Sequence, residues 1–94
     1  MSVETSLAFD ATAPWRLSDQ VSLRDESFGA LAYHHGNRRL VFLKSRELVE
    51  VVRALGGFDS ARAAIAASVP TDQHHRYEAA LSALVKSGIL DACQ

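Results

Sequence analysis

The four histidines are the residues of this chain best suited to metal or acid–base chemistry, and they form two adjacent pairs, His34-His35 and His74-His75. Neighbouring side chains point to opposite faces of a strand and lie about 100° apart on a helix. Metal ligands on one helix are instead typically spaced i, i+4. Neither pair can therefore hold a metal ion alone. We predict no metal site, and a site shared between the two pairs stays the alternative.

The other residue types used in catalysis stand in positions that do not support it. Cys93 is next to last in the chain, where we expect no pocket to activate its thiol. The sequence has no G-x-S-x-G motif and no glycine-rich loop leading from a strand into a helix. The carboxylates Asp25 and Glu26 lie in a predicted polar connection. We therefore predict that the chain is not an enzyme, has no catalytic residue and holds no cofactor.

The composition indicates one small globular domain. The chain has 94 residues, of which 48% are hydrophobic and 22% charged, as is usual for a folded protein. Ten basic and eleven acidic residues give a net charge of −1, which provides no basic footprint for nucleic acid. We interpret residues 1–13, which are small and polar, as a flexible N-terminal arm, and residues 14–94 as the domain.

Cysteine content and hydropathy indicate the cellular compartment. A single cysteine permits no internal disulfide, which fits a reducing environment. No cationic start precedes an apolar run, so no secretory signal is indicated. No apolar stretch approaches the ~18 residues of a membrane span. We expect a cytoplasmic protein without membrane contact.

The first half of the domain predicts three strands joined by short connections. Apolar and polar residues alternate there, as in strands with one buried face. The segment 35–38 contains Gly36 and Asn37, which tolerate positive φ and favour a hairpin turn. Successive strands favour an antiparallel meander. The predicted strands cover residues 21–24, 28–34 and 39–43.

The second half of the domain predicts three helices. Ser45, Ser60 and Thr71 stand at the expected N-caps. Apolar residues at helical spacing follow each cap, Gly56-Gly57 ends the first helix, and Gly88 ends the last. A three-stranded antiparallel meander followed by three helices is an α+β fold, and the spacing of the helices is winged-helix-like.

The third predicted strand is unusual because it is apolar on both faces and lies at the edge of the sheet. Leu40 and Phe42 point one way, and Val41 and Leu43 the other. Exposed edges are normally protected by proline, bulges or inward charges. An open edge can accept a visiting peptide strand by β-augmentation or pair with a second copy of the chain in a homodimer. The alternative is an ordinary strand with both faces covered.

The sequence resembles the PqqD-like peptide-recognition domains that act on ribosomally made and modified peptides. It resembles more narrowly the peptide chaperones of the mycofactocin system, over residues 15 to 90. The segments that carry the resemblance are FGALAY (28–33), RLVFLKS (39–45), ELVEVV (47–52) and LVKSGIL (84–90).

The resemblance implies a function without catalysis. Such domains bind the leader of a precursor peptide and present it to a modifying enzyme, here a radical S-adenosylmethionine (SAM) maturase. The leader adds to the third strand, beside the last helix. The strand residues are then Arg39, Leu40, Val41, Phe42 and Leu43, and the groove wall is formed by Arg76, Tyr77, Ala80, Ala83 and Leu84.

A winged-helix regulator that binds nucleic acid is the alternative function. Winged helices often contact DNA through the third helix. Here that helix carries Asp72, Arg76, Glu78 and Lys86, so its charge is balanced and phosphate neutralisation would be weak. We therefore predict that nucleic acid is not a partner.

Overall fold

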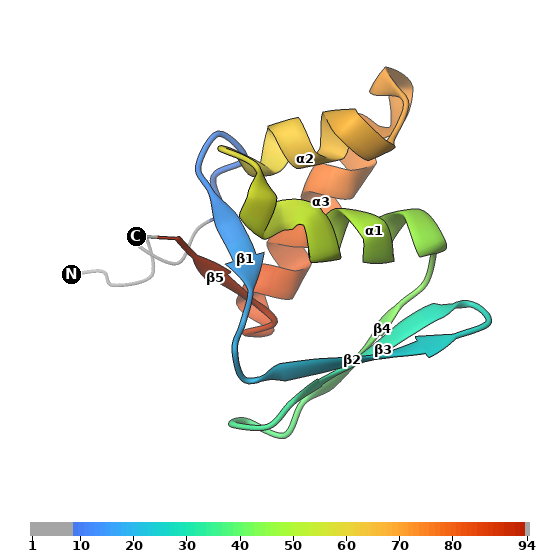
Figure 1. Ribbon diagram of the computed structural model, residues 1–94, viewed down its shortest axis with the longest axis vertical. Coiled ribbons are helices and arrows are strands. Elements are labelled where there is room, and N and C mark those ends of the chain that lie inside the picture. The colour runs from blue at the N-terminus through green and yellow to red at the C-terminus, as the bar shows by residue number, and fades with distance from the viewer. Residues whose placement is uncertain (1–8, 94) are drawn as a thin grey trace.

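The computed structural model of the chain describes residues 9–93. Strands occupy its first half and helices most of its second half (Figure 1), which confirms the predicted α+β class. In chain order the elements are β1 (Trp15–Leu17), β2 (Val21–Glu26), β3 (Gly29–His34), β4 (Leu40–Leu43), α1 (Arg46–Ala54), the 3₁₀ helix η2 (Leu55–Gly57), α2 (Ala61–Ser68), the 3₁₀ helix η3 (Thr71–Gln73), α3 (His74–Lys86) and β5 (Leu90–Ala92).

Strands β2, β3 and β4 form the predicted antiparallel meander, in that order. Ala32 pairs with Leu23 on one side and with Val41 on the other. Ala30 and Ala32 are fully buried, and their small side chains allow helix α1 to pack on β3. Figure 1 shows α1 between this sheet and α2, so the core lies between one sheet face and the helices.

The connection between β2 and β3 is shorter than predicted. Asp25 and Glu26, which we expected in a polar connection, belong to β2 and pair with Ala30 and Gly29. The turn is reduced to residues 27–28. The polar character of Asp25 and Glu26 suggested a loop, but their side chains belong to an edge strand with a solvent-facing side, where charged residues are tolerated.

Gly29 is required by this tight hairpin. Its φ of 150° lies in the region that L-residues rarely adopt, and a Cβ there would clash with the carbonyl oxygen of Leu43. The close approach of β4 to the start of β3 therefore depends on the absence of a side chain.

Two of the three predicted helix caps are confirmed. The Ser45 hydroxyl accepts a hydrogen bond from the Leu48 amide, and the Ser60 hydroxyl accepts one from the Ala63 amide, each at 3.0 Å. The predicted cap at Thr71 is wrong, because this residue lies inside η3 and α3 begins at His74. None of the helices described is long and apolar enough to cross a membrane.

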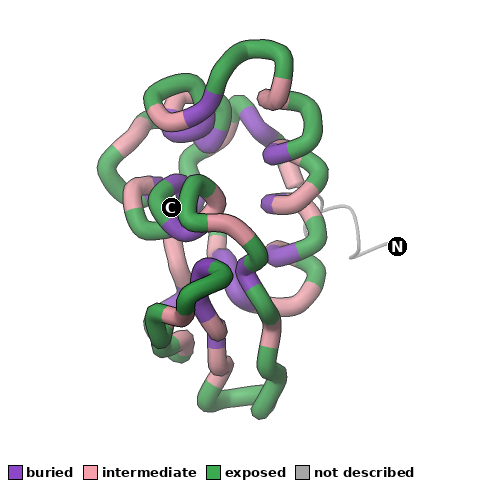
Figure 2. Tube along the Cα trace, turned by 90° about the vertical axis from the view of Figure 1, so that its right-hand side faces the viewer, coloured by how far each residue is buried: buried purple, intermediate pink, exposed green. Residues whose placement is uncertain are grey.

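The buried residues alternate with exposed ones along the helices and face the interior of the molecule (Figure 2). Burying a large aliphatic side chain contributes roughly 1.5–3 kcal/mol, so a few of them decide whether a chain this short folds. Those without any exposed surface include Leu43, Leu55, Ile65, Leu81 and Ile89.

A second sheet of β1 and β5 was not predicted. Trp15 pairs with Ala92, and Leu17 with Leu90. Each strand has three residues, too few to establish a period in sequence. The Trp15 side chain is buried, and its indole N–H donates to the Asp10 carbonyl oxygen at 2.8 Å. This sheet joins β1, near the start of the described residues, to β5, which follows α3.

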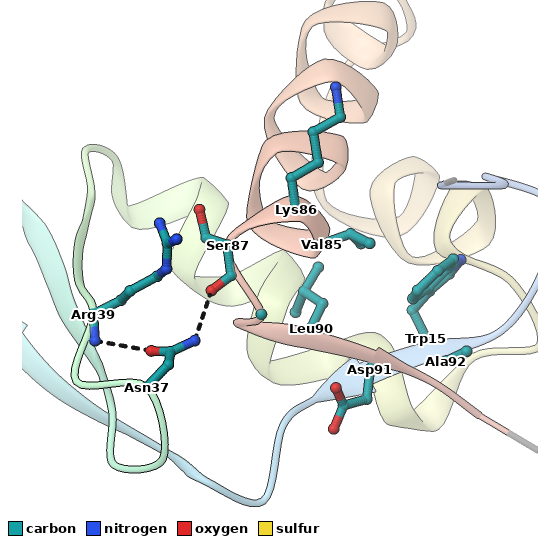
Figure 3. A pocket seen from close by; sticks show the side chains of 10 residues that line it. Trp15, Asn37, Arg39, Val85, Lys86, Ser87, Leu90, Asp91 and Ala92 are labelled. Atoms are coloured by element: carbon teal, nitrogen blue, oxygen red, sulfur yellow. Dashed lines mark hydrogen bonds between the residues drawn. The ribbon is translucent and has the colours of Figure 1, made fainter. Parts of the chain in front are cut away.

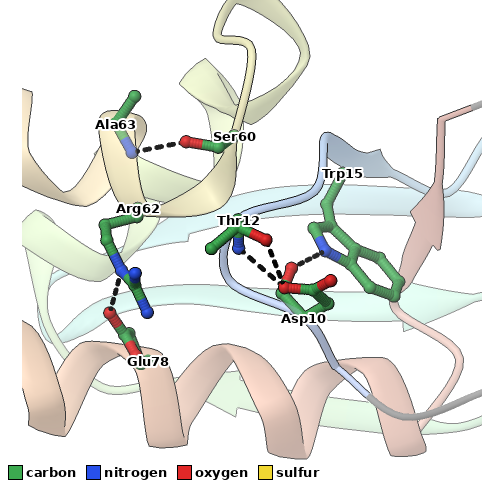
Figure 4. Close-up of polar contacts among 7 residues, drawn as sticks. All are labelled: Asp10, Thr12, Trp15, Ser60, Arg62, Ala63 and Glu78. Carbon is green, nitrogen blue, oxygen red and sulfur yellow. Dashed lines mark hydrogen bonds and ion pairs between the residues drawn. The ribbon is translucent and has the colours of Figure 1, made fainter.

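Part of the segment predicted as an arm contacts helix α2. The carbonyl oxygens of Ala13 and Ala11 accept hydrogen bonds from the amides of Ala61 and Arg62, at 3.0 and 2.9 Å, at the helix N-terminus, where amides have no partner in the helix. Figure 4 shows Asp10 and Thr12 folded into a turn beside Trp15. The rest of the predicted arm, residues 1–8, lies outside the described residues.

Candidate functional site

Strand β4 is an edge strand in the described part of the chain. The sheet order is β2-β3-β4, and β1 and β5 form a separate sheet, so neither of them covers the outer side of β4. The segment of residues 9–13 contacts α2 and β1 instead. The outer side of β4 is therefore open to an incoming strand over these residues.

The backbone groups that β4 presents outward belong to Leu40 and Phe42. The His34 amide donates to the Arg39 carbonyl oxygen at 2.9 Å, which marks a hydrogen-bonded pair across β3 and β4. Such pairs alternate in an antiparallel ladder, so Val41 and Leu43 direct their amides and carbonyls to β3. Leu40 and Phe42 direct theirs away from the sheet, where a visiting strand can reach them.

Both faces of β4 are apolar, as predicted. Leu43 is fully buried and Val41 partly buried, whereas the side chains of Leu40 and Phe42 are 55% and 54% exposed. The Phe42 ring stacks on that of Phe28, with ring centroids 5.6 Å apart. Large apolar side chains so exposed on a sheet face are typical of interaction surfaces.

Helix α3 lies alongside β4, and polar contacts join it to the segments at both ends of the strand. Ser45, which follows β4, has its hydroxyl oxygen 3.4 Å from the Tyr77 hydroxyl, in the first half of α3. Asn37, which precedes β4, donates from its side-chain amide to the Ser87 carbonyl oxygen at the other end of α3, also at 3.4 Å. The helix and the strand thus run in opposite directions beside each other.

A cavity lies at each of these two ends. The smaller one, about 210 Å³, opens where β4 leads into α1, and its walls come from both α1 and α3. The larger one, about 430 Å³, lies where the turn before β4 meets the end of α3 and β5 (Figure 3). The smaller cavity is lined by Lys44, Ser45, Leu48, Arg76, Tyr77 and Ala80.

The predicted groove residues of α3 divide into three groups. Arg76, Tyr77 and Ala80 line the smaller cavity. Ala83 is exposed on the helix surface, and Leu84 is 5% exposed and belongs to the core. The stripe of apolar residues along α3 could not separate a groove position from a core position, because alanine, leucine and tyrosine occur at both.

Among the predicted strand residues, Arg39 lines the larger cavity. Its backbone amide donates to the Asn37 side-chain oxygen at 2.8 Å, and Figure 3 shows its side chain extending toward Ser87. Sequence reasoning missed further lining residues. Lys44 and Leu48 could have been found because they continue the edge strand into the next helix. Lys86 is contributed by the end of α3, and Asp91 by the unpredicted β5.

Another cavity, about 490 Å³, lies at the opposite edge of the sheet. It is bordered by the turn between β2 and β3 and by α1, and its walls are largely charged. Arg53 of α1 pairs there with Asp25 of β2 at 3.0 Å. The charges in this cavity are thus partly engaged in holding α1 to the sheet.

Three of the four histidines have structural contacts. The His34 ring accepts hydrogen bonds from the amides of Gly36 and Asn37, which shapes the hairpin turn. The His35 ring lies 2.7 Å from the Ser22 hydroxyl, and the His74 ring 2.8 Å from the Val69 carbonyl oxygen. Over residues 9–93, no three histidine, cysteine or acidic side chains converge as a metal site would require.

The chain is similar to known proteins over most of its length. Residues 14–91 match the profile of the Peptide chaperone MftB family. The peptide chaperone MftB of Mycolicibacterium smegmatis is 48% identical over 89 residues, which cover 94% of this chain and 87% of the relative. The protein of the same name from Mycobacterium tuberculosis is 43% identical, with 90% of this chain and 79% of the relative covered. No solved structure gives a significant match.

Proposed function

This chain belongs to the peptide chaperone MftB family, and we propose that it binds the leader of a ribosomal precursor peptide by strand addition to β4. Members of the family are peptide chaperones and not enzymes. The open edge of β4 is the observation that carries the proposed binding mode, because a peptide strand needs unpaired backbone groups to pair with.

The edge can pair with the backbone of a peptide strand. Leu40 and Phe42 each offer one amide and one carbonyl, and the residue between them faces β3. A peptide that pairs with these groups becomes a fourth strand of the sheet, in the order β2-β3-β4-peptide. Main-chain pairing supplies affinity that does not depend on the peptide's side chains.

Selectivity for one peptide then comes from the space between β4 and α3. Alternate side chains of an added strand point to the inner face, toward the cavities at the two ends of the strand. Tyr77 and Ala80 form the wall of the smaller cavity and limit the size of the side chain it accepts.

Presentation of the bound peptide to a radical SAM maturase requires a second surface that remains free. Strand addition at the edge leaves the outer face of the sheet uncovered, where Phe28 and Phe42 stack. We assign the contact with the maturase to this face. The chaperone then acts in the cytoplasm, where ribosomes make the precursor.

The edge also offers a surface to a second copy of the chain. Two β4 strands can pair antiparallel across a twofold axis at Val41. The outward amide and carbonyl of Leu40 in one copy then face those of Phe42 in the other. Such a homodimer occupies the groups that the peptide needs. We therefore expect peptide binding to shift any dimer to monomers, which sedimentation at several protein concentrations measures.

The test of strand addition is proline substitution at the outward positions. Leu40→Pro and Phe42→Pro each remove one amide donor that faces away from the sheet, where proline is tolerated. Binding of a synthetic candidate precursor peptide is measured by calorimetry. We expect each proline variant to bind about tenfold more weakly than its alanine control, Leu40→Ala or Phe42→Ala, because the loss of one hydrogen bond is the difference.

Val41→Pro is a control at a position whose amide faces inward. The Val41 amide faces β3, so proline there breaks the internal ladder and lowers the stability of the fold. Equal peptide affinity in the proline and alanine variants at positions 40 and 42, with intact circular dichroism spectra, would exclude strand addition. Absence of any binding by the unmodified chain would contradict the proposed function as a whole.

A further inference from the structure

The ten basic residues of this chain separate into two groups by their contacts. Four of them pair with a carboxylate within 3.0 Å, namely Arg16, Arg24, Arg53 and Arg62. The other six form no ion pair with any carboxylate of residues 9–93, and we refer to them as the six free cations. They are Arg38, Arg39, Lys44, Arg46, Arg76 and Lys86.

Five of the six free cations lie around β4 and the side of α3 next to it. The sixth, Arg46, lines the cavity at the opposite edge of the sheet, together with acidic residues of β2 and α1. Arg38 and Arg39 directly precede β4, and Lys86 ends α3; Arg39 and Lys86 line the larger cavity. We call these three the upstream cluster. Figure 3 shows Arg39 and Lys86 on the two sides of the Ser87 backbone.

The downstream cluster stands at the other end of the strand. Lys44 follows β4, and Arg76 lies in the first turn of α3. Lys44 and Arg76 line the smaller cavity together. The Arg76 guanidinium donates a hydrogen bond to the neutral side chain of Gln73 at 3.1 Å, so its charge is not compensated by that contact.

Acidic residues near the two clusters are fewer than the cations. Asp91 lines the larger cavity with Arg39 and Lys86. Glu47 follows Arg46 in the first turn of α1, where it interacts favourably with the helix dipole. The lining of the smaller cavity contains Lys44 and Arg76 and no acidic residue. Each cluster therefore keeps a net positive charge, although the whole chain carries −1. Between the clusters lie the four apolar residues of β4.

We propose that the ligand of β4 is an acidic peptide: a short apolar stretch, about as long as β4, with carboxylate side chains on both sides of it. This inference rests on the proposed function and adds the chemistry of its ligand. The apolar stretch pairs with Leu40 and Phe42, while flanking aspartates or glutamates reach the two clusters. Charge complementarity of this kind fixes the register of the added strand and accelerates its association.

A nucleic acid fits the same surface less well. Phosphate groups require a continuous basic surface, whereas these cations are divided by an apolar strand and accompanied by Asp91 and Glu47. The outward amides of Leu40 and Phe42 match a peptide backbone and have no regular partner along a duplex. Binding of duplex DNA is therefore an outcome that the experiment must be able to reveal.

The experiment compares variants of equal charge with the synthetic precursor peptide as the probe. Arg39→Gln with Lys86→Gln neutralises the upstream cluster in part, and Lys44→Gln with Arg76→Gln neutralises the downstream cluster. The matched control is Arg16→Gln with Arg62→Gln, which changes the net charge equally but removes cations that already have partners. Calorimetry at about 0.05 M and about 0.5 M NaCl separates screened contacts from the rest. A second peptide carries glutamine and asparagine in place of its acidic residues.

We expect the unmodified chain to lose at least about tenfold in affinity at the higher salt concentration, and each cluster variant to lose about tenfold at the lower one. The control pair should bind within about twofold of the unmodified chain. The unmodified chain should bind the second peptide, in which amides replace the acidic side chains, about as weakly as the cluster variants bind the acidic peptide.

Three results would overturn the inference alone. Binding that persists unchanged with the amidated peptide, or an equal loss in the control and cluster variants, would show that local charge does not select the ligand. Tighter binding of a 20-base-pair (roughly two helical turns) DNA duplex than of the peptide at low salt would assign the clusters to nucleic acid. Absence of any peptide binding to the unmodified chain at either salt concentration would reject the proposed function as well.

Discussion

The hydroxyl groups of Ser45 and Tyr77 lie 3.4 Å apart, at the point where β4 ends, α1 begins and α3 passes by. The Ser45 hydroxyl also caps α1 by accepting a hydrogen bond from the Leu48 amide at 3.0 Å. One side chain thus ends the edge strand, starts a helix and contacts the groove wall. The position of the smaller cavity depends on this junction.

The first prediction separates the two contacts of Ser45. Ser45→Ala removes the helix cap and should lower the free energy of unfolding by about 1 kcal/mol. Tyr77→Phe removes the long hydroxyl contact and keeps the buried ring, so it should cost less, about 0.5 kcal/mol. Urea denaturation measures both. A loss of stability in Tyr77→Phe as large as in Ser45→Ala would show that the hydroxyl contact matters as much as the cap.

The second prediction concerns the groove wall. Ala80 lines the smaller cavity, whereas its neighbour Ala79 is exposed on another side of α3. Leucine and alanine have similar helix propensities, so Ala80→Leu and Ala79→Leu should leave the fold intact. We expect Ala80→Leu to fill the cavity and weaken peptide binding about tenfold, and Ala79→Leu to have no effect. Equal affinities in calorimetry would place the peptide elsewhere.

The third prediction separates peptide binding from presentation. Phe28 lies in the turn before β3, and its ring is 41% exposed and stacks on Phe42. Phe28→Ser removes an aromatic contact surface without touching the backbone of β4. Affinity for the precursor peptide should change less than about twofold, whereas affinity for the maturase should fall about tenfold, as for an aromatic residue in an interface. A variant with unchanged maturase affinity would exclude this face.

The fourth prediction concerns pH. The Thr12 hydroxyl donates a hydrogen bond to the Asp10 carboxylate at 2.6 Å, the Thr12 amide donates another at 2.9 Å, and these contacts hold the pKa of Asp10 below its ordinary value of 3.8. The charged form is therefore favoured in the folded state. Its stabilising effect is fully present above pH 3.8 and is lost as the pH falls through the lowered pKa.

We accordingly expect Asp10→Asn to be less stable than the unmodified chain near neutral pH and equally stable in strong acid. Thermal unfolding across this range measures the difference. In a Thr12→Val background, which removes the hydroxyl donor, the pH dependence of that difference should be smaller. An unchanged dependence would mean that the Thr12 hydroxyl is not its principal cause.

Sequence patterns predicted the parts of the fold that have a sustained period or a local chemical signal. The meander follows from alternation along residues 21–43, and the starts of α1 and α2 follow from the hydroxyls of Ser45 and Ser60. Thr71 carries the same type of signal, but the extended backbone at Pro70 leads first into a 3₁₀ turn. The preference of threonine for a helix N-cap does not show whether a 3₁₀ helix or an α-helix begins at that residue.

The elements missed by sequence analysis depend on contacts between distant parts of the chain. Strands β1 and β5 exist because Trp15 and Ala92 pair, and neither three-residue segment has a recognisable pattern alone. The candidate site was predicted only in part for the same reason. Its strand was visible in the sequence, whereas the cavity walls contributed by β5 and by the end of α3 became apparent only in three dimensions.

The pairing of β1 with β5 has a consequence for synthesis of the protein. Strand β1 emerges early from the ribosome, yet its backbone partner in the described structure is formed by residues 90–92. Bringing such distant segments together carries a loop-closure entropy that is compensated only when the last strand docks. The nascent chain can therefore assemble its meander and first helix early in translation, but it completes the domain only after residues 90–92 have left the ribosome.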